Sequence, residues 1–193
     1  FSPLPPISLG DEVPVLGFAQ RINIPAVISS ERETRGVAMV GVNPANEGIS
    51  LYRDFVIEGE DLAGPEDGRL LMGKALAETL QTRVGRRVVV IMEDADGKSR
   101  ERGYRIAGIF DAPTKISEQL LVFTGLEALQ AALGNAKLSE PITELSLVLG
   151  AEEDRGVAQR ELAAQHPQLV VKDWREMQPQ VAEIVDVVDA QMA

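Results

Sequence analysis

The sequence lacks cysteine altogether and contains a single histidine among its 193 residues. Without thiols, the chain can form no disulfide, no thiolate nucleophile and no cysteine-bound zinc or iron–sulfur site. The histidine, His166, precedes Pro167 in a polar stretch that is typical of a solvated connection. A Gly-x-Ser-x-Gly elbow is also missing from the sequence, so hydrolases that depend on an activated serine or cysteine are disfavoured.

Positive charge is scarce as well. The sequence has 19 Lys and Arg residues against 30 Asp and Glu residues, which gives a formal net charge of −11. Because proteins bind nucleic acid through cations that neutralise phosphates, this balance disfavours a nucleic-acid partner. No run approaches the roughly 20 apolar residues that a membrane-spanning helix needs. We therefore expect these residues to cross no bilayer by themselves.

The residues that are present are typical of a folded protein. Apolar residues make up 45% of the chain and charged residues 25%, both close to globular averages. The length suits one domain or two small lobes. The segment at residues 1–6 contains three prolines, does not begin with methionine and has no signal-peptide pattern. We therefore expect the chain to be a piece of a larger parent protein.

Hydrophobic periodicity and turn residues predict an alternation of short strands and helices. The predicted strands are residues 22–29, 36–42, 69–72, 88–92, 104–110, 121–123, 143–149 and 169–172. The predicted helices are residues 74–82, a segment that Thr124 caps and that ends at Gly134, and residues 154–165. The predicted fold class is therefore α+β.

The C-terminal segment has the pattern of an amphipathic helix. Asp173 can cap it, with Glu176 three residues later, and Trp174 lies at its start. Its apolar side chains recur at helical spacing, at Met177, Val181, Ile184, Val185, Val188 and Met192. The helix either packs on the core of this chain or continues beyond residue 193 in the parent protein.

One stretch matches most of a phosphate-binding loop. Residues 68–75 fit G-x-x-x-x-G-K, but Ala75 replaces the serine or threonine that would coordinate magnesium. Leu70, Leu71 and Met72 also predict a buried strand, whereas a phosphate cradle needs a glycine-rich turn. The sequence therefore disfavours nucleotide binding here, and Gly73 is expected to form a strand-to-helix corner.

The connection at residues 93–103 begins like a calcium-binding loop, but its basic residues oppose a divalent cation. We expect a hairpin turn at Asp96 and Gly97, and we identify the loop as a possible contact with a protein partner. The residues assigned to this contact are Asp94, Asp96, Lys98, Arg100 and Arg102.

A local positive cluster, at Arg83, Arg86 and Arg87, lies just before the predicted strand 88–92. Two interpretations remain open for it. The arginines can form a solvated face that pairs with nearby carboxylates, or they can recognise a partner.

The order and spacing of several short motifs resemble one protein family. The motifs are residues 41–44 (GVNP), 58–59 (EG), 71–77 (LMGKALA), 84–85 (VG), 104–110 (YRIAGIF) and 174–177 (WREM). Together they resemble the extracytoplasmic domain of ABC transporter permeases of the MacB/FtsX/LolC type, over residues 22–192. That domain lies between the first and second transmembrane helices of its parent.

The resemblance implies a two-lobed domain, with porter-like and sabre-like lobes over residues 1–193, on the periplasmic face of the inner membrane. The parent permease would have four transmembrane helices and would work as a dimer with a cytoplasmic ATPase subunit. It would couple ATP hydrolysis to export, lipoprotein release or another envelope process, with a possible periplasmic protein partner. No catalytic group, cofactor or metal is implied for the domain.

For residues 174–193, the resemblance implies a stalk helix that leads toward a membrane span of the parent. The stalk residues are Trp174, Met177, Val181, Ile184, Val185 and Val188. Lipoprotein-release members of the family carry a longer, proline-bearing hook where this chain has residues 93–103. We therefore expect no docking of a lipoprotein carrier by that route.

Two other functions remain open from the residues alone. The chain could be a free-standing α+β module that binds a ligand or peptide in a cleft between lobes. It could also be an enzyme that uses paired carboxylates, for example among Glu58, Glu60 and Asp61. General acid–base catalysis needs a pocket that shifts carboxylate pKa values, and an exposed acidic loop does not supply one.

Overall fold

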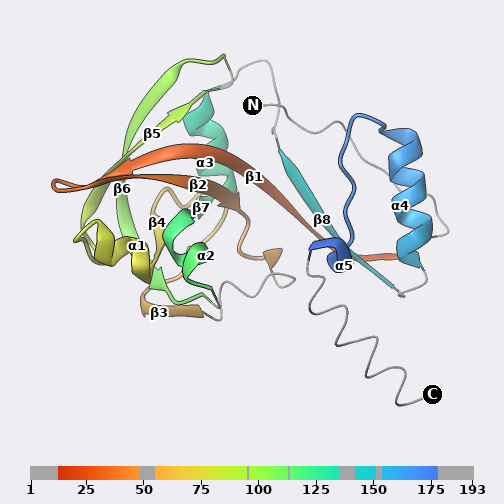
Figure 1. Ribbon diagram of the computed structural model, residues 1–193, viewed down its shortest axis with the longest axis horizontal. Helices are drawn as coiled ribbons and strands as arrows, with labels where there is room; N and C mark the ends of the chain where they lie inside the picture. The colour runs from red at the N-terminus through yellow and green to blue at the C-terminus, as the bar shows by residue number, and fades with distance from the viewer. Residues whose placement is uncertain are drawn as a thin grey trace. The chain divides into compact units, whose positions relative to one another are not determined.

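The computed structural model describes residues 13–47, 55–94, 96–112, 114–134, 142–150 and 154–177. They divide into two compact units, and the elements of each are labelled in Figure 1. Of the described residues, 17–147 form the first unit, while 13–16 and those from 148 onward form the second. Strands and helices are mixed along the chain, so the predicted α+β class with two lobes is confirmed.

Among the described residues, eight strands form the sheet. They are β1 (Val15–Ser29), β2 (Thr34–Val42), β3 (Val56–Gly59), β4 (Leu70–Gly73), β5 (Arg87–Glu93), β6 (Ser99–Phe110), β7 (Leu121–Gly125) and β8 (Glu144–Leu149). β1 pairs with β2 and β5, β5 with β6, β6 with β4, β4 with β7, and β7 with β2. These pairings join six strands into a closed ring, with β3 added beside β6 and β8 beside β1.

The ring encloses the main hydrophobic core. Along β1, Ile22, Ile24 and Ile28 are buried and alternate with residues that face outward, as expected for a strand with one buried face. β5 repeats the pattern with Val88 and Val90. The alternation of apolar residues in the sequence therefore predicts both the strands and the direction in which their side chains point.

A second, smaller core covers the opposite face of part of the sheet. Its buried residues are Val40, Val42, Leu62, Leu71, Ala107 and Phe110. The rings of Phe110 and Phe123 meet edge to face there, with centroids 5.4 Å apart. Because β4, residues 106–110 of β6 and residues 121–123 of β7 are covered on both faces, these stretches are continuous apolar runs rather than alternating ones.

The helices are α1 (Lys74–Thr79), α2 (Lys115–Leu120), α3 (Leu126–Leu133), α4 (Asp154–Gln165) and α5 (Trp174–Met177). α3 buries Leu126, Leu129 and Leu133, which are spaced for one helical face. It ends, as predicted, at Gly134, whose left-handed backbone (φ 62°) suits glycine.

The predicted cap of α3 is wrong. Thr124 stays in β7, where its hydroxyl donates to the carbonyl oxygen of Arg69 at 2.8 Å, and Gly125 takes the cap position. The free amide groups of the first turn donate instead to the carbonyl oxygen of Pro65, from Glu127 at 2.8 Å and from Ala128 at 3.1 Å. A loop from elsewhere in the chain therefore caps the helix, which local sequence does not reveal.

Several predicted boundaries also change. The strand predicted at 104–110 begins at Ser99, and the helix predicted at 74–82 ends at Thr79, because Gln81 adopts a left-handed conformation (φ 51°). Residues 169–172 are described but form no strand, and Val170 is 82% exposed there. An apolar stretch without a neighbouring strand cannot satisfy its backbone in a ladder.

The described part of the second unit includes α4 and α5. α4 buries Ala158 and Leu162. The carboxylate of Asp173 accepts the Glu176 amide at 2.8 Å, which confirms the predicted cap of the last helix. The stalk positions Val181, Ile184, Val185 and Val188 lie outside the described residues. Among the described helices, none has both the length and the hydrophobicity that a membrane span requires.

Candidate functional site

A pocket with four arginines in its lining, called here the arginine pocket, opens on the first unit. It has a volume of about 530 Å³. Its lining residues come from the β1–β2 turn, from the segment between α1 and β5, and from β5 and β6: Ser30, Glu31, Arg32, Gln81, Thr82, Gly85, Arg86, Arg87 and Arg105. Four arginines and one glutamate give this lining a net charge of +3, in a chain whose total charge is −11.

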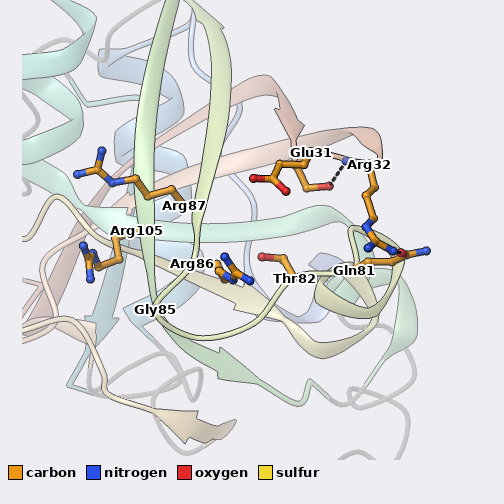
Figure 2. A pocket seen from close by; sticks show the side chains of 9 residues that line it. Glu31, Arg32, Gln81, Thr82, Gly85, Arg86, Arg87 and Arg105 are labelled. Atoms are coloured by element: carbon orange, nitrogen blue, oxygen red, sulfur yellow. Dashed lines mark hydrogen bonds between the residues drawn. The ribbon is translucent and has the colours of Figure 1, made fainter.

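Two of the arginines face each other across a strand pair. Arg87 on β5 is the direct partner of Arg105 on β6 in the antiparallel register, so both side chains lie on the same face of the sheet. Figure 2 shows them beside each other at one side of the pocket. Both are exposed, and neither is within ion-pair distance of a carboxylate in the described part of the chain.

The β1–β2 turn and the segment that follows α1 form the opposite side of the pocket. The Ser30 hydroxyl accepts backbone amides from Arg32 and Glu33, which fixes the β1–β2 turn. The Arg32 side chain then donates to the Gln81 side chain at 2.6 Å, across 49 residues of sequence. In Figure 2, Glu31 extends from this turn toward Thr82 and Arg86. The pocket therefore joins segments that are distant in the chain.

Part of this pocket is predictable from the sequence. Arg86 and Arg87 belong to the positive cluster and line the pocket, whereas Arg83 in the same cluster does not. No sequence pattern connects Arg32 and Arg105 with them. The signal for Arg105 lies in the strand register, which places it opposite Arg87, and register between β5 and β6 depends on the turn that joins them.

The predicted contact loop is a tight hairpin turn between β5 and β6. Asp94 is 1% exposed, and its carboxylate accepts three hydrogen bonds from residues of the same hairpin. One oxygen accepts the amides of Asp96 and Lys98, at 2.9 and 2.8 Å, and the other accepts the Arg100 side chain at 2.8 Å. The amide of Lys98 and the side chain of Arg100 hold the pKa of this carboxyl below its ordinary value. Asp94 therefore shapes the turn, and its carboxylate is not presented to a partner.

The other four residues assigned to that contact are exposed, but two of them are not in a loop. Arg100 and Arg102 lie in β6, which begins at Ser99. The guanidinium of Arg102 lies 5.5 Å from the centre of the Tyr104 ring, in a cation–π arrangement. Asp96 and Lys98 remain as the exposed charges at the tip. Contact with a partner through this hairpin stays a prediction.

The G-x-x-x-x-G-K stretch forms β4 and the start of α1, as a strand-to-helix corner. Gly73 is the corner residue, and a Cβ there would overlap the backbone of Glu118 on α2. The buried Glu118 carboxylate lies at the start of α1 and accepts the Ala75 amide at 3.3 Å. A carboxylate thus occupies the place that a phosphate would need, in agreement with the sequence argument.

The acidic residues considered for catalysis do not meet in the arginine pocket. Glu58 is exposed at the end of β3, and Glu60 forms an ion pair of 2.8 Å with Arg69. Asp61 accepts the backbone amide of Leu62 at 2.7 Å. Across the described ranges, no group of three or more histidine or acidic side chains is arranged to hold a metal ion.

Comparisons with known proteins identify the fold. No family model matches the sequence, and no curated protein matches it. The chain is similar to the extracellular domain of the noncanonic ABC-type transporter YknZ from Gram-positive bacteria, with 12% identity, a TM-score of 0.57 and coverage of 79% of this chain and 77% of that one. A domain of a Porphyromonas gingivalis protein named as a permease has 16% identity and a TM-score of 0.45, with coverage of 81% of this chain and 65% of that one.

The similarity to the YknZ domain covers most of both chains. It bears out, at the level of the fold, the resemblance predicted from the short sequence motifs. This chain has the α+β fold of an extracellular ABC-transporter domain.

Proposed function

We propose that this chain is the extracytoplasmic domain of an ABC transporter permease subunit. The observation that carries the proposal is the fold similarity to the extracellular domain of YknZ over 79% of the chain. The sequence motifs quoted above point to the same class independently. In this role the domain is non-catalytic, and it transmits motion between the membrane part of the transporter and an event outside the cytoplasm.

The parent protein provides the first test. We expect its reading frame to encode apolar segments of about 20 residues on both sides of this region. We also expect the parent protein to associate with a separate ATPase subunit. A parent without such flanking segments would contradict the proposal and favour a free-standing binding module.

The stalk provides the second test, in the intact transporter. Ile184→Asp or Val188→Asp places a charge on the apolar face of the proposed stalk helix. We expect ATP hydrolysis to continue while transport is lost, and association with the ATPase to remain. Glu183→Gln is the matched control, because it changes a polar position of the same helix. Full transport by both aspartate variants would contradict a stalk.

A contact with an envelope protein at the β5–β6 hairpin is a further part of the proposal. Exchanging the two tip charges, Asp96→Lys with Lys98→Glu, keeps the net charge and the backbone bonds to Asp94. We expect this exchange to abolish capture of the partner in a pull-down from the native envelope. Exchanging the exposed pair Glu33 and Arg35, which lie 3.2 Å apart in the β1–β2 hairpin, is the control. Equal capture by both exchanged forms would remove the hairpin from the interface.

A further inference from the structure

The arginine pocket is not explained by the proposed mechanical role. Arg87 and Arg105 are direct cross-strand neighbours, and like charges in that position repel each other and destabilise the strand pair. Packing does not require this arrangement, because both side chains are exposed. Arg86 and Arg32 line the same pocket, so four arginines contribute to a lining that surrounds about 530 Å³.

Known interactions within the pocket leave most of this positive charge uncompensated. The Arg32 guanidinium donates to the neutral amide oxygen of Gln81. Glu31 is the one acidic lining residue, and none of the four arginines forms an ion pair with a carboxylate in the described ranges. The pocket lining thus carries a net charge of +3, although the chain as a whole is acidic. A bound anion would neutralise this positive charge.

The chemistry of the lining indicates the kind of anion. Guanidinium groups match the oxygens of phosphate and carboxylate through paired hydrogen bonds, and phosphate offers more charge and more acceptors in a compact group. The volume falls within the usual range of small-ligand pockets and exceeds what one phosphate group fills. The lining also includes Thr82, whose hydroxyl group can donate to a phosphate oxygen.

We propose that this pocket binds a compact ligand that carries two or more phosphate-type negative charges. The ligand can be a soluble diphosphate or the phosphate headgroup of a lipid, since the two present the same chemistry to the arginines. Arg87 and Arg105 form one side of the site, while Arg86 and Arg32 face it from the two turns. Glu31 limits the affinity, because its carboxylate repels the ligand.

The test is titration calorimetry on the whole chain with pyrophosphate, at low and at physiological ionic strength. We expect saturable binding that weakens with salt. Arg105→Gln and Arg87→Gln should each weaken binding about tenfold or more, as expected when one charged hydrogen-bonding group is lost. Arg83→Gln is the matched control, because Arg83 lies in the same segment but outside the pocket, and it should change affinity less than twofold.

Two further measurements separate this site from a general effect of charge or of misfolding. Glu31→Gln should strengthen pyrophosphate binding, whereas a pocket for a cationic ligand would give no pyrophosphate binding in any variant. In thermal unfolding without ligand, Arg105→Gln should have a Tm equal to or above that of the parent chain, because it relieves repulsion with Arg87. A weakened variant that also unfolds at lower temperature would attribute the loss to folding and count against the site.

The source of the phosphate is distinguished by vesicles. Binding to phosphatidylglycerol vesicles that pyrophosphate displaces indicates a lipid headgroup, and binding of pyrophosphate without vesicle binding indicates a soluble ligand. Pure phosphatidylcholine vesicles serve as the neutral control. Absence of pyrophosphate binding at millimolar concentration and low salt, or an equal loss in Arg83→Gln and Arg105→Gln, would overturn the proposal. Both results are independent of transport, so they do not depend on the proposed function.

Discussion

The Arg21 guanidinium on β1 donates two parallel hydrogen bonds to the carboxylate of Glu47, from Nε and Nη2, each 2.8 Å long. Glu47 follows β2 and is 1% exposed, while Arg21 is 17% exposed and also donates to Glu144 on β8 at 2.6 Å. Burial by itself lowers the pKa of Arg21, but the bonds and charges of Glu47 and Glu144 outweigh it and raise that pKa above its ordinary value. Three segments of the first unit thus meet at one ion-pair network.

Glu47→Gln should destabilise the protein strongly. Removing this charge leaves the half-buried guanidinium of Arg21 without its main counter-charge, and breaking a buried pair from one side costs about 3 kcal/mol. Urea unfolding at neutral pH measures the loss. Glu144→Gln is the matched control, with an expected cost below about 1 kcal/mol, because the Glu144 side chain is 40% exposed. Equal costs for the two variants would show that Glu47 is not the principal partner.

Gly73→Ala should disrupt the corner between β4 and α1. A Cβ at this position would overlap the backbone carbonyl of Glu118, and backbone cannot move aside as a flexible side chain can. We expect the free energy of unfolding to fall by about 2 kcal/mol, which is typical of overpacking, as measured by thermal or urea unfolding. Gly36→Ala in β2 is the control, because a Cβ there meets no atom within 4 Å. A Gly73→Ala variant as stable as the control would contradict this packing.

Asp67 should contribute stability that depends on pH. Burial alone raises the pKa of Asp67, but hydrogen bonds from the Arg69 side chain and from the amides of Ala63 and Arg69 outweigh it, so the pKa lies below its ordinary value of 3.8. The unfolded chain therefore binds a proton here at higher pH than the folded one does. The stabilisation is complete above pH 3.8 and is lost as the pH falls through the lowered folded value.

Asp67→Asn tests this dependence. The variant should be less stable than the parent chain at pH 7, and the difference should shrink as the pH falls below 3.8, as followed by urea unfolding across that range. Glu66→Gln, at the neighbouring position of the same loop, is the control. A difference between Asp67→Asn and the parent chain that is constant with pH would mean that the carboxylate charge is not responsible.

Asp94→Asn should loosen the β5–β6 hairpin locally. The amide group replaces an acceptor of the Arg100 bond with a donor, so the turn loses an interaction that its carboxylate makes now. Hydrogen exchange at the amides of Asp96 and Lys98 should become about tenfold faster, with little change elsewhere. Asp96→Asn, whose side chain is exposed, should leave the exchange unchanged. A uniform change across the chain would show that Asp94 acts on global stability instead.

Local sequence patterns predict the strands and helix ends that depend on neighbouring residues. The alternation in β1 around Ile24 and in β5 around Val90 predicts strands because one face of each is buried, and the end of α3 at Gly134 follows from its left-handed backbone. β3 has no such pattern. Its residues are half-buried or exposed, and it exists because its backbone pairs with β6. The first turn of α3 likewise depends on a distant residue, because its amides donate to the Pro65 carbonyl, which lies outside the helix.

The candidate pocket divides in the same way. Residue identity alone establishes the composition, the absence of thiols, the acidic total charge and the positive cluster at Arg86 and Arg87. The tertiary structure alone decides that Arg105 lies opposite Arg87, that Arg32 comes from a distant turn, and that Asp94 is buried inside its own turn. The reason is that strand register and loop packing are set by contacts between residues far apart in the chain, whereas composition and periodicity are properties of neighbours.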